Sequence, residues 1–224
     1  VDQLFAPSDS GRIPIVGVMG SHQATELSKI IAWLFELSGK HTGLACADGL
    51  YLDQRRVVSK DARSFELGQR LLINRVLDAA VFESAGMQLM LEWFGVGPGD
   101  EVIIPAYTYA STATAVLHCG AIPVMVDADP GSFELSIKNV EKAIGPKTKA
   151  IIPVDIGGWP CDYDELFQLV NREDHQKLFT PQHPHQEKLG RILIMADAAH
   201  SIGSRYKGQA VGKLADLTVI SLHA

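Results

Sequence analysis

Short hydrophobic runs alternate with longer amphipathic segments along most of the chain. The short runs favour buried strands, and the longer segments repeat hydrophobic residues at the spacing of a helical face. The predicted strands cover residues 13–18, 42–46, 79–83, 101–105, 122–126, 150–154, 192–196 and 217–222, and the predicted helices cover 24–37, 62–74, 86–94, 109–119, 137–144 and 163–170. Strands that alternate with helices are joined in parallel by crossover connections, so the pattern predicts an α/β fold with a mainly parallel sheet flanked by helices.

The polar stretch 171–188 interrupts this alternation because it shows no helical or strand periodicity. We expect a surface insertion here. Its histidines, His175, His183 and His185, raise the question of a metal site. The stretch lacks cysteines or carboxylates at the spacing typical of metal ligands and contains prolines, so a surface loop is favoured and no metal ligand is assigned.

Composition narrows the functional classes. The chain has 224 residues, 46% of them hydrophobic and 21% charged, which is ordinary for a packed protein of one large domain or two small ones. The formal net charge of -6 and the lack of a basic stripe argue against nucleic acid as a partner. No apolar run reaches the roughly 18 residues of a membrane span, so no membrane partner is expected. Cys46, Cys119 and Cys161 form no CxxC pair, which favours a reduced, cytoplasmic chain.

A glycine-containing turn near the start of the chain has the layout of a phosphate-binding loop. Residues 13–18 form the predicted strand, and Gly20 and Ser21 lie in the turn before the amphipathic helix. The backbone N–H groups of such a turn, together with the helix N-terminus, face an anion. The layout by itself predicts a βαβ unit and leaves open whether a phosphate binds.

Residues 11–85 resemble the ATP-dependent amide ligases of the Mur type, most closely the ligase domain of cyanophycin synthetases. The segments that carry this resemblance are 12–19, 39–44, 48–53 and 76–83. The resemblance implies ATP and magnesium as ligands of Gly20, Ser21, Thr25 and Glu83. Gln23 and Ala24 stand where the family has a second glycine and a phosphate-binding lysine, so a cation is missing from the phosphates. We therefore expect a structural βαβ unit descended from a P-loop ligase.

Residues 84–224 resemble the DegT-type sugar aminotransferases, which use pyridoxal 5′-phosphate (PLP) to aminate keto-sugars. This resemblance rests on the segments 95–100, 101–109, 120–127, 146–154, 196–201 and 221–224. Several segments in the order of the family are hard to obtain by chance. The resemblance implies part of the large domain of a type I PLP enzyme, so we divide the chain into a ligase-like segment, 1–83, and an incomplete aminotransferase-like domain, 84–224.

The aminotransferase resemblance assigns a group of residues to PLP binding. They are Asp197, His200, Tyr109, Ser84, Ala85 and Ser221. Asp197 would stabilise the protonated ring nitrogen on which the electron-withdrawing chemistry of PLP depends. Tyr109 would stack on the ring face, and His200 would lie beside the ring oxygen. The phosphate would sit at the helix N-terminus near Ser84 and Ala85, with the Ser221 hydroxyl as a further ligand.

These assignments have structural alternatives. Asp197 could cap the turn after its strand, His200 could be a hydrogen-bonded core residue, and Tyr109 could pack at the start of its helix. The family's Schiff-base lysine would fall about two residues beyond Ala224, and Lys207 matches a surface hairpin, where we expect it to be solvated. We therefore assign no catalytic residue, leave open whether the chain is an enzyme, and expect it to be inactive as it stands.

The resemblances imply three functional hypotheses. The first is amino transfer to a nucleotide-linked keto-sugar, with the nucleotide sugar and an amino donor as small-molecule partners and with a homodimer as one expectation, since the family commonly completes its site with a second subunit. The second is an ATP-dependent amino-acid ligase of the cyanophycin type. The third is a fusion or fragment without catalysis.

Overall fold

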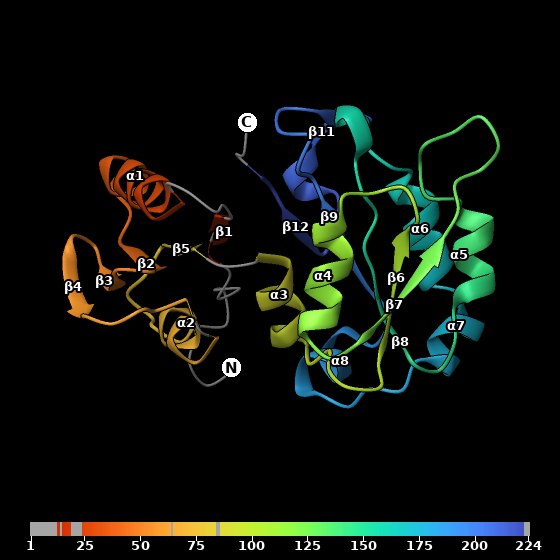
Figure 1. Ribbon diagram of the computed structural model, residues 1–224, viewed down its shortest axis with the longest axis horizontal. Coiled ribbons are helices and arrows are strands. Elements are labelled where there is room, and N and C mark those ends of the chain that lie inside the picture. Colours follow the sequence, from red (N-terminus) through yellow and green to blue (C-terminus); the bar gives the residue numbers. More distant parts are fainter. Residues whose placement is uncertain (1–12, 14, 19–23, 64, 84–85, 222–224) are drawn as a thin grey trace. The chain divides into compact units, whose positions relative to one another are not determined.

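The computed structural model describes residues 13, 15–18, 24–63, 65–83 and 86–221 (Figure 1). The chain divides between Gly86 and Met87 into two compact units, which we call the first and the second unit. Within the described ranges, no helix is long and apolar enough to cross a membrane. The predicted phosphate-binding turn, with Gly20 and Ser21, lies outside the described residues, as do Ser84 and Ala85.

The first unit is a five-stranded sheet with helices α1 and α2 on opposite sides of its strands (Figure 1). In chain order its elements are β1 (Ile15–Val18), α1 (Ala24–Leu37), β2 (Thr42–Cys46), β3 (Gly49–Leu52), β4 (Arg55–Val58), α2 (Phe65–Leu72) and β5 (Ala79–Glu83). The strand order is β1-β5-β2-β3-β4. Strands β1, β5 and β2 pair in parallel, whereas β3 and β4 are added as an antiparallel hairpin.

Small residues let this sheet approach its helices closely. Helix α1 buries Ala24, Ser28 and Ala32. On β2, a Cβ at Gly43 would lie 2.6 Å from Leu77 Cδ1, so a larger residue would force that side chain to move. The strands β2 and β5 are buried along their whole length, as expected for central parallel strands covered by helices.

The second unit is an α/β sheet with five parallel strands in the order β12-β9-β8-β6-β7. Its elements are α3 (Gly86–Phe94), β6 (Glu101–Pro105), α4 (Ala110–His118), β7 (Ile122–Val126), α5 (Ile137–Ala143), β8 (Thr148–Ile151), the 3₁₀ turn Ile156–Gly158, α6 (Tyr163–Val170), α7 (Glu173–Leu178), α8 (Pro184–Leu189), β9 (Leu193–Asp197), the short hairpin β10 (Arg205–Tyr206) and β11 (Gln209–Ala210), the 3₁₀ turn Val211–Lys213 and β12 (Leu217–Val219). Because the strands are parallel, their carboxyl ends form one edge of the sheet.

The predicted α/β architecture with a mainly parallel sheet is confirmed. The bounds of β2, β5, β6 and β7 and of helices α1, α3 and α6 agree with the predicted ranges. The hairpin of β3 and β4 was not predicted, because its turn depends on Asp53, which adopts a positive φ of 51° that its sequence does not announce. The remaining predicted elements are present with shifted ends.

The stretch 171–188 lies mostly at the surface, as predicted, but it is helical although its sequence shows no periodicity. This stretch forms α7 and α8, each of six residues, which is too short for a periodic pattern to be recognised. His175 is buried, and its Nδ1 lies 2.8 Å from the Leu169 carbonyl oxygen. The fully buried Gln186 donates to the Gly95 carbonyl oxygen at 3.1 Å. These two buried side chains of an otherwise exposed stretch therefore help to hold the second unit together.

Candidate cofactor site

A buried carboxylate lies at the carboxyl edge of the parallel sheet in the second unit. Asp197 is the last residue of β9 and is 4% exposed. Its Oδ2 accepts a hydrogen bond from the Thr112 hydroxyl of α4 at 2.9 Å, and its Oδ1 accepts one from the Ala199 N–H at 3.2 Å. Ligands of open α/β sheets bind at this edge, outside the carboxyl ends of the strands.

The environment of Asp197 disfavours its negative charge. Burial raises the pKa of this carboxyl group, and the hydrogen bonds from Thr112 and Ala199 oppose the rise. Among the ion pairs between described residues, none includes Asp197. A buried carboxylate without a cation is costly. A ligand that carries a protonated ring nitrogen would supply the missing charge, so this residue fits the group that the sequence assigns to it.

The structure brings two other predicted residues to the same edge. Tyr109 is the N-cap residue of α4, three positions before Thr112, and its side chain is 79% exposed. The tyrosine is therefore not a packing residue at the helix start. His200 is exposed in the turn after β9, with its Nδ1 3.4 Å from the Gly157 nitrogen. Ser221, which follows β12, is half-buried, and no more is described of the phosphate-binding group.

Two polar residues near Asp197 escaped the sequence reasoning. Thr112 is fully buried inside α4, where its hydroxyl reaches a carboxylate 85 positions away in the chain. Asp155 is also fully buried, and its backbone N–H donates to the Asp197 carbonyl oxygen at 3.0 Å. The available signal for Asp155 was its place directly after a predicted strand, which is the place that Asp197 also occupies.

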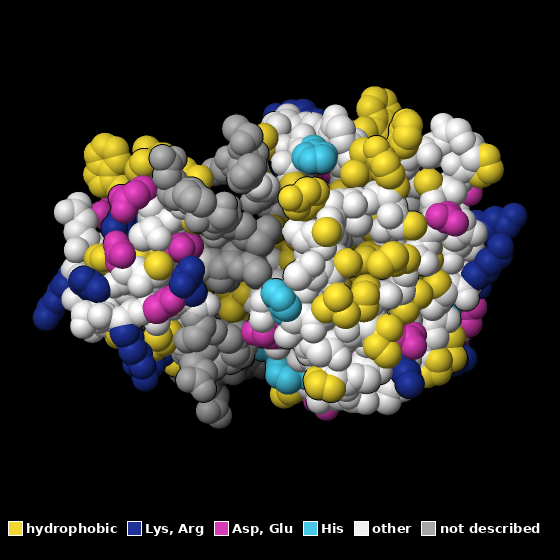
Figure 2. All heavy atoms as spheres, in the orientation of Figure 1, with side chains coloured by type: hydrophobic (Ala, Val, Ile, Leu, Met, Phe, Trp, Pro, Cys, Tyr) yellow, Lys and Arg dark blue, Asp and Glu magenta, His cyan; other side chains and the backbone are white. Residues whose placement is uncertain are grey.

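Large hydrophobic side chains are exposed in the loops that follow the strands of this sheet. Figure 2 shows hydrophobic side chains gathered at the upper end of the second unit, where these loops lie. The exposed residues are Tyr107 and Tyr109 after β6, Phe133 after β7, Trp159 after β8 and Ile202 after β9. Aromatic rings at the edge of a binding site suit a ligand with flat or apolar faces.

Lys207 has the position that the sequence predicts. It lies in the turn between β10 and β11, at a positive φ of 48°, and its side chain is exposed. Its Nζ pairs with the Asp164 carboxylate. The expectation of a solvated surface lysine is confirmed.

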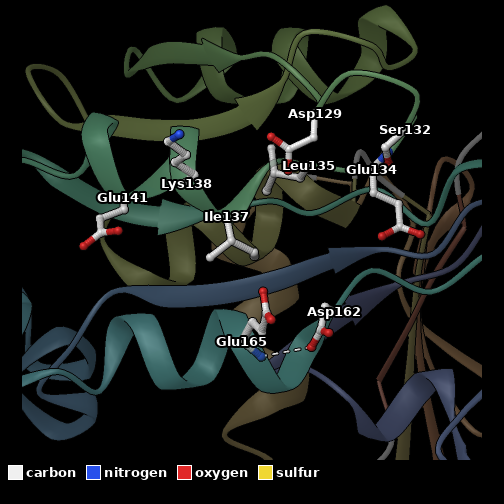
Figure 3. Close-up of a pocket in the computed structure, with 9 residues that line it drawn as sticks. All are labelled: Asp129, Ser132, Glu134, Leu135, Ile137, Lys138, Glu141, Asp162 and Glu165. Carbon is white, nitrogen blue, oxygen red and sulfur yellow. Dashed lines mark hydrogen bonds between the residues drawn. The ribbon is translucent and has the colours of Figure 1, made fainter.

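A cavity of about 490 Å³ elsewhere in the second unit contains none of the predicted site residues. Figure 3 shows that its lining is rich in carboxylates, with Lys138 as the cation among the residues drawn. Burial and the nearby carboxylates Asp162 and Asp155 raise the pKa of Glu134, which lines this cavity. Carboxylates without a further sign of a ligand do not define a site, so this cavity does not compete with the edge near Asp197.

The residues of the ligase hypothesis that are described lie in the first unit. Glu83 ends β5 and is 6% exposed. Its Oε2 accepts hydrogen bonds from the Thr25 hydroxyl at 2.6 Å and from the Ala47 N–H at 2.8 Å, and Arg63 Nη1 lies 3.7 Å from its Oε1. The carboxylate therefore has partners from three segments of its own chain.

Comparison with known proteins identifies the family to which the chain belongs. The profile of the DegT/DnrJ/EryC1/StrS aminotransferase family matches residues 76–178 and 185–224. The chain belongs to this family. The resemblance stated for residues 84–224 is thereby confirmed, and PLP is confirmed as the cofactor of the family.

Individual relatives match a little under two thirds of the chain. The chain is 37% identical over 138 residues to GDP-perosamine synthase of Caulobacter vibrioides, which covers 62% of this chain and 33% of that protein. It is 48% identical to a structure from Streptococcus pneumoniae described as a sugar aminotransferase in its PLP form, with a TM-score of 0.60, covering 62% of this chain and 35% of that one. An uncharacterized protein of Methanocaldococcus jannaschii is 34% identical over 141 residues, which covers 63% of this chain and 32% of that protein.

The chain spans about a third of the length of these relatives. The matches support the α/β fold of the second unit and its place in the family. They give no support to the resemblance of residues 11–85 to Mur-type ligases, to its P-loop or to its ATP chemistry. We therefore describe the first unit by its own contacts and assign it no family.

Proposed function

We propose that the second unit binds PLP at the carboxyl edge of its sheet, as part of an aminotransferase that acts on a nucleotide-linked keto-sugar. The observation that carries this proposal is Asp197, a carboxylate buried beside a hydroxyl and an amide donor without an ion-pair partner among the described residues. A protonated ring nitrogen of the cofactor would provide the missing positive partner of this carboxylate. When bound, PLP withdraws electron density from the carbon that carries the amino group.

The other residues of the edge have supporting roles in this proposal. With the cofactor bound, Asp197 would keep the ring nitrogen protonated, Tyr109 would contact the ring, and His200 would donate a hydrogen bond to it. Ser84, Ala85 and Ser221 bind the phosphate, a role that derives from the family resemblance alone. Thr112 joins this group because its hydroxyl orients the Asp197 carboxylate.

The substrate, the assembly, the location and the domain division belong to the same proposal. The names GDP-perosamine synthase and sugar aminotransferase support a nucleotide sugar and an amino donor as small-molecule partners. We propose a cytoplasmic protein, a homodimer as its assembly, and a boundary near residue 84 between the N-terminal segment and the aminotransferase domain. None of the contacts of Glu83 favours the ligase function, because Thr25, Ala47 and Arg63 already surround that carboxylate.

Titration with pyridoxamine 5′-phosphate tests the proposal. This amine form of the cofactor needs no covalent bond to the protein, so calorimetry on the whole chain measures the site alone. We expect binding, and we expect Asp197→Asn to weaken it about 100-fold, the effect of losing a charged hydrogen-bonding partner.

The matched control is Asp127→Asn, because Asp127 also follows a strand of this sheet but is exposed. It should bind like the unchanged protein. Equal affinity for the Asp197→Asn and Asp127→Asn variants would rule out Asp197 as the ring-nitrogen partner. A separate titration with ATP and magnesium should show no binding, and micromolar affinity there would revive the ligase hypothesis.

A further inference from the structure

The turns that follow β8 and β9 are joined around a buried carboxylate. The Asp155 carboxylate accepts hydrogen bonds from the Tyr163 hydroxyl at 2.8 Å, from the Cys161 N–H at 3.1 Å and from the Ser201 hydroxyl at 2.7 Å. Tyr163 and Cys161 belong to the segment after β8, whereas Ser201 belongs to the turn after β9. The Ser201 bond therefore connects the two turns at the residue next to His200 in the chain.

Further contacts fix the distance between these turns. The Ser204 hydroxyl donates to the Gly158 carbonyl oxygen at 2.8 Å. Gly158 has a positive φ of 84°, and a Cβ on it would lie 3.0 Å from the His200 carbonyl oxygen. A residue larger than glycine would be strained here on both counts. The backbone at Gly158 is thus held close to the backbone at His200.

This arrangement has a consequence for the protonation of the His200 ring. Its Nδ1 faces the N–H of Gly157 at 3.4 Å, near the long limit of a hydrogen bond. A backbone N–H can only donate, so Nδ1 must offer its lone pair and cannot carry a hydrogen. The ring hydrogen of neutral His200 then lies on Nε2.

We propose that Asp155 is a positioning residue: through the Ser201 hydroxyl it holds the turn after β9 so that the Gly157 N–H selects the Nε2-protonated tautomer of His200. The Tyr163 and Cys161 donors hold the carboxylate itself. No cofactor is needed for this selection, because every contact lies within the second unit. A histidine fixed in this way has its single ring N–H on Nε2 and is ready to donate.

This inference deepens the proposed function, since a hydrogen-bond donor is what the ring oxygen of a bound cofactor would require of His200. Its test does not depend on cofactor binding. Tautomers are read from long-range ¹H–¹⁵N correlation spectra of the ¹⁵N-labelled whole chain without cofactor, at a pH where histidines are neutral. The His200→Gln variant assigns the signal. His118, an exposed residue at the end of α4, serves as the internal reference.

In the unchanged protein we expect the Nδ1-protonated fraction of His200 to be about fivefold lower than that of His118, the ratio that one modest hydrogen bond produces. Equal fractions for the two histidines would overturn the proposal, and this measurement needs no variant to fold. If the unchanged protein fails to bind pyridoxamine phosphate but His200 still shows the expected tautomer, only the proposed function is contradicted.

Two single substitutions distinguish the positioning of His200 by Asp155 from a general contribution of Asp155 to stability. Ser201→Ala and Tyr163→Phe each remove one hydroxyl from the Asp155 carboxylate, but only Ser201 connects it to the turn of His200. Ser201→Ala should bring His200 to the tautomer ratio of His118, whereas Tyr163→Phe should leave His200 unchanged. Identical responses to both substitutions, or no response to Ser201→Ala, would show that Asp155 does not position His200.

Discussion

The two units contain the same local arrangement and differ in one component. In each, a buried carboxylate ends a parallel strand and accepts a hydrogen bond from a threonine hydroxyl on a helix: Glu83 from Thr25 in the first unit, and Asp197 from Thr112 in the second. A backbone N–H is a further donor in both cases. Burial, strand position and hydroxyl contact are therefore not sufficient to mark a ligand site.

The component that differs is a cation. Arg63, whose nearer ion-pair partner is Asp61 at 2.6 Å, also lies 3.7 Å from Glu83, whereas no ion pair within the described part of the chain includes Asp197. The first carboxylate is compensated by its own chain, and burial raises the pKa of the second. A perturbed carboxyl group at a sheet edge is a candidate for function, and a compensated one is a candidate for structure. The comparison predicts that substitutions at the two carboxylates will have opposite effects on stability.

The largest effect is expected for Glu83→Leu. This change removes the acceptor of the Thr25 hydroxyl and of the Ala47 N–H, and each buried donor left unpaired is costly. We expect the first unit to lose about 3 kcal/mol of stability. Native-state hydrogen exchange at the amides of β5 measures this loss, and the amides of β9 should be unaffected.

Glu83→Gln is the control, because an amide oxygen can still accept both hydrogen bonds. It should cost clearly less than Glu83→Leu. If both variants exchange like the unchanged protein, Glu83 is not a structural residue and the comparison fails on the side of the first unit.

Removing the two threonine hydroxyls is expected to give an intermediate effect. Thr112→Val leaves a fully buried carboxylate with one donor fewer and should destabilise the second unit by about 1.5 kcal/mol. Thr25→Val should cost the first unit less, because Thr25 is only partly buried and Arg63 remains near Glu83. Chemical denaturation followed through hydrogen exchange at β5 and β9 compares the pair. A larger loss of stability for Thr25→Val than for Thr112→Val would contradict the view that Glu83, unlike Asp197, has a compensating cation.

Asp197→Asn should increase the stability of the second unit, opposite to the losses expected above. The amide oxygen can accept from the Ala199 N–H while the amide NH2 group donates to the Thr112 hydroxyl oxygen, so both contacts persist without a buried charge. We therefore expect the cofactor-free second unit to gain about 1 kcal/mol at neutral pH, a common gain when a functional residue is replaced. Burial raises the folded-state pKa of Asp197, so its protonated form favours folding. That contribution is complete below the unfolded pKa of about 4 and is lost as the pH rises through the raised folded pKa.

The stability difference between Asp197→Asn and the unchanged protein should therefore shrink as the pH falls from neutral toward about 4. Denaturation of both proteins across this range gives the measurement, with Asp127→Asn as the control of the same charge change at an exposed position. A variant that is less stable than the unchanged protein at neutral pH would mean that Asp197 is compensated in the folded chain.

The sequence could predict where the two carboxylates lie in their sheets, but not which side chains contact them. Asp197 and Glu83 both follow apolar runs, and a carboxylate after a buried strand falls at the edge of a parallel sheet. The hydrogen bond from Thr112 spans 85 positions and the one from Ser201 to Asp155 spans 46, so both depend on the fold and leave no periodic signal. The short helices α7 and α8 were missed for the related reason that single buried residues, such as Gln186, hold them in place.

The smallest effect is expected for Arg63→Gln. The arginine side chain is 50% exposed and lies at the edge of the Glu83 contact, so water shares in screening the carboxylate. The loss of stability in the first unit should be about 0.5 kcal/mol or less, as for other exposed ion pairs, and should vanish in concentrated salt. Hydrogen exchange at β5 in low and high salt checks both statements. A loss of several kcal/mol that persists in salt would make Arg63 the main support of Glu83.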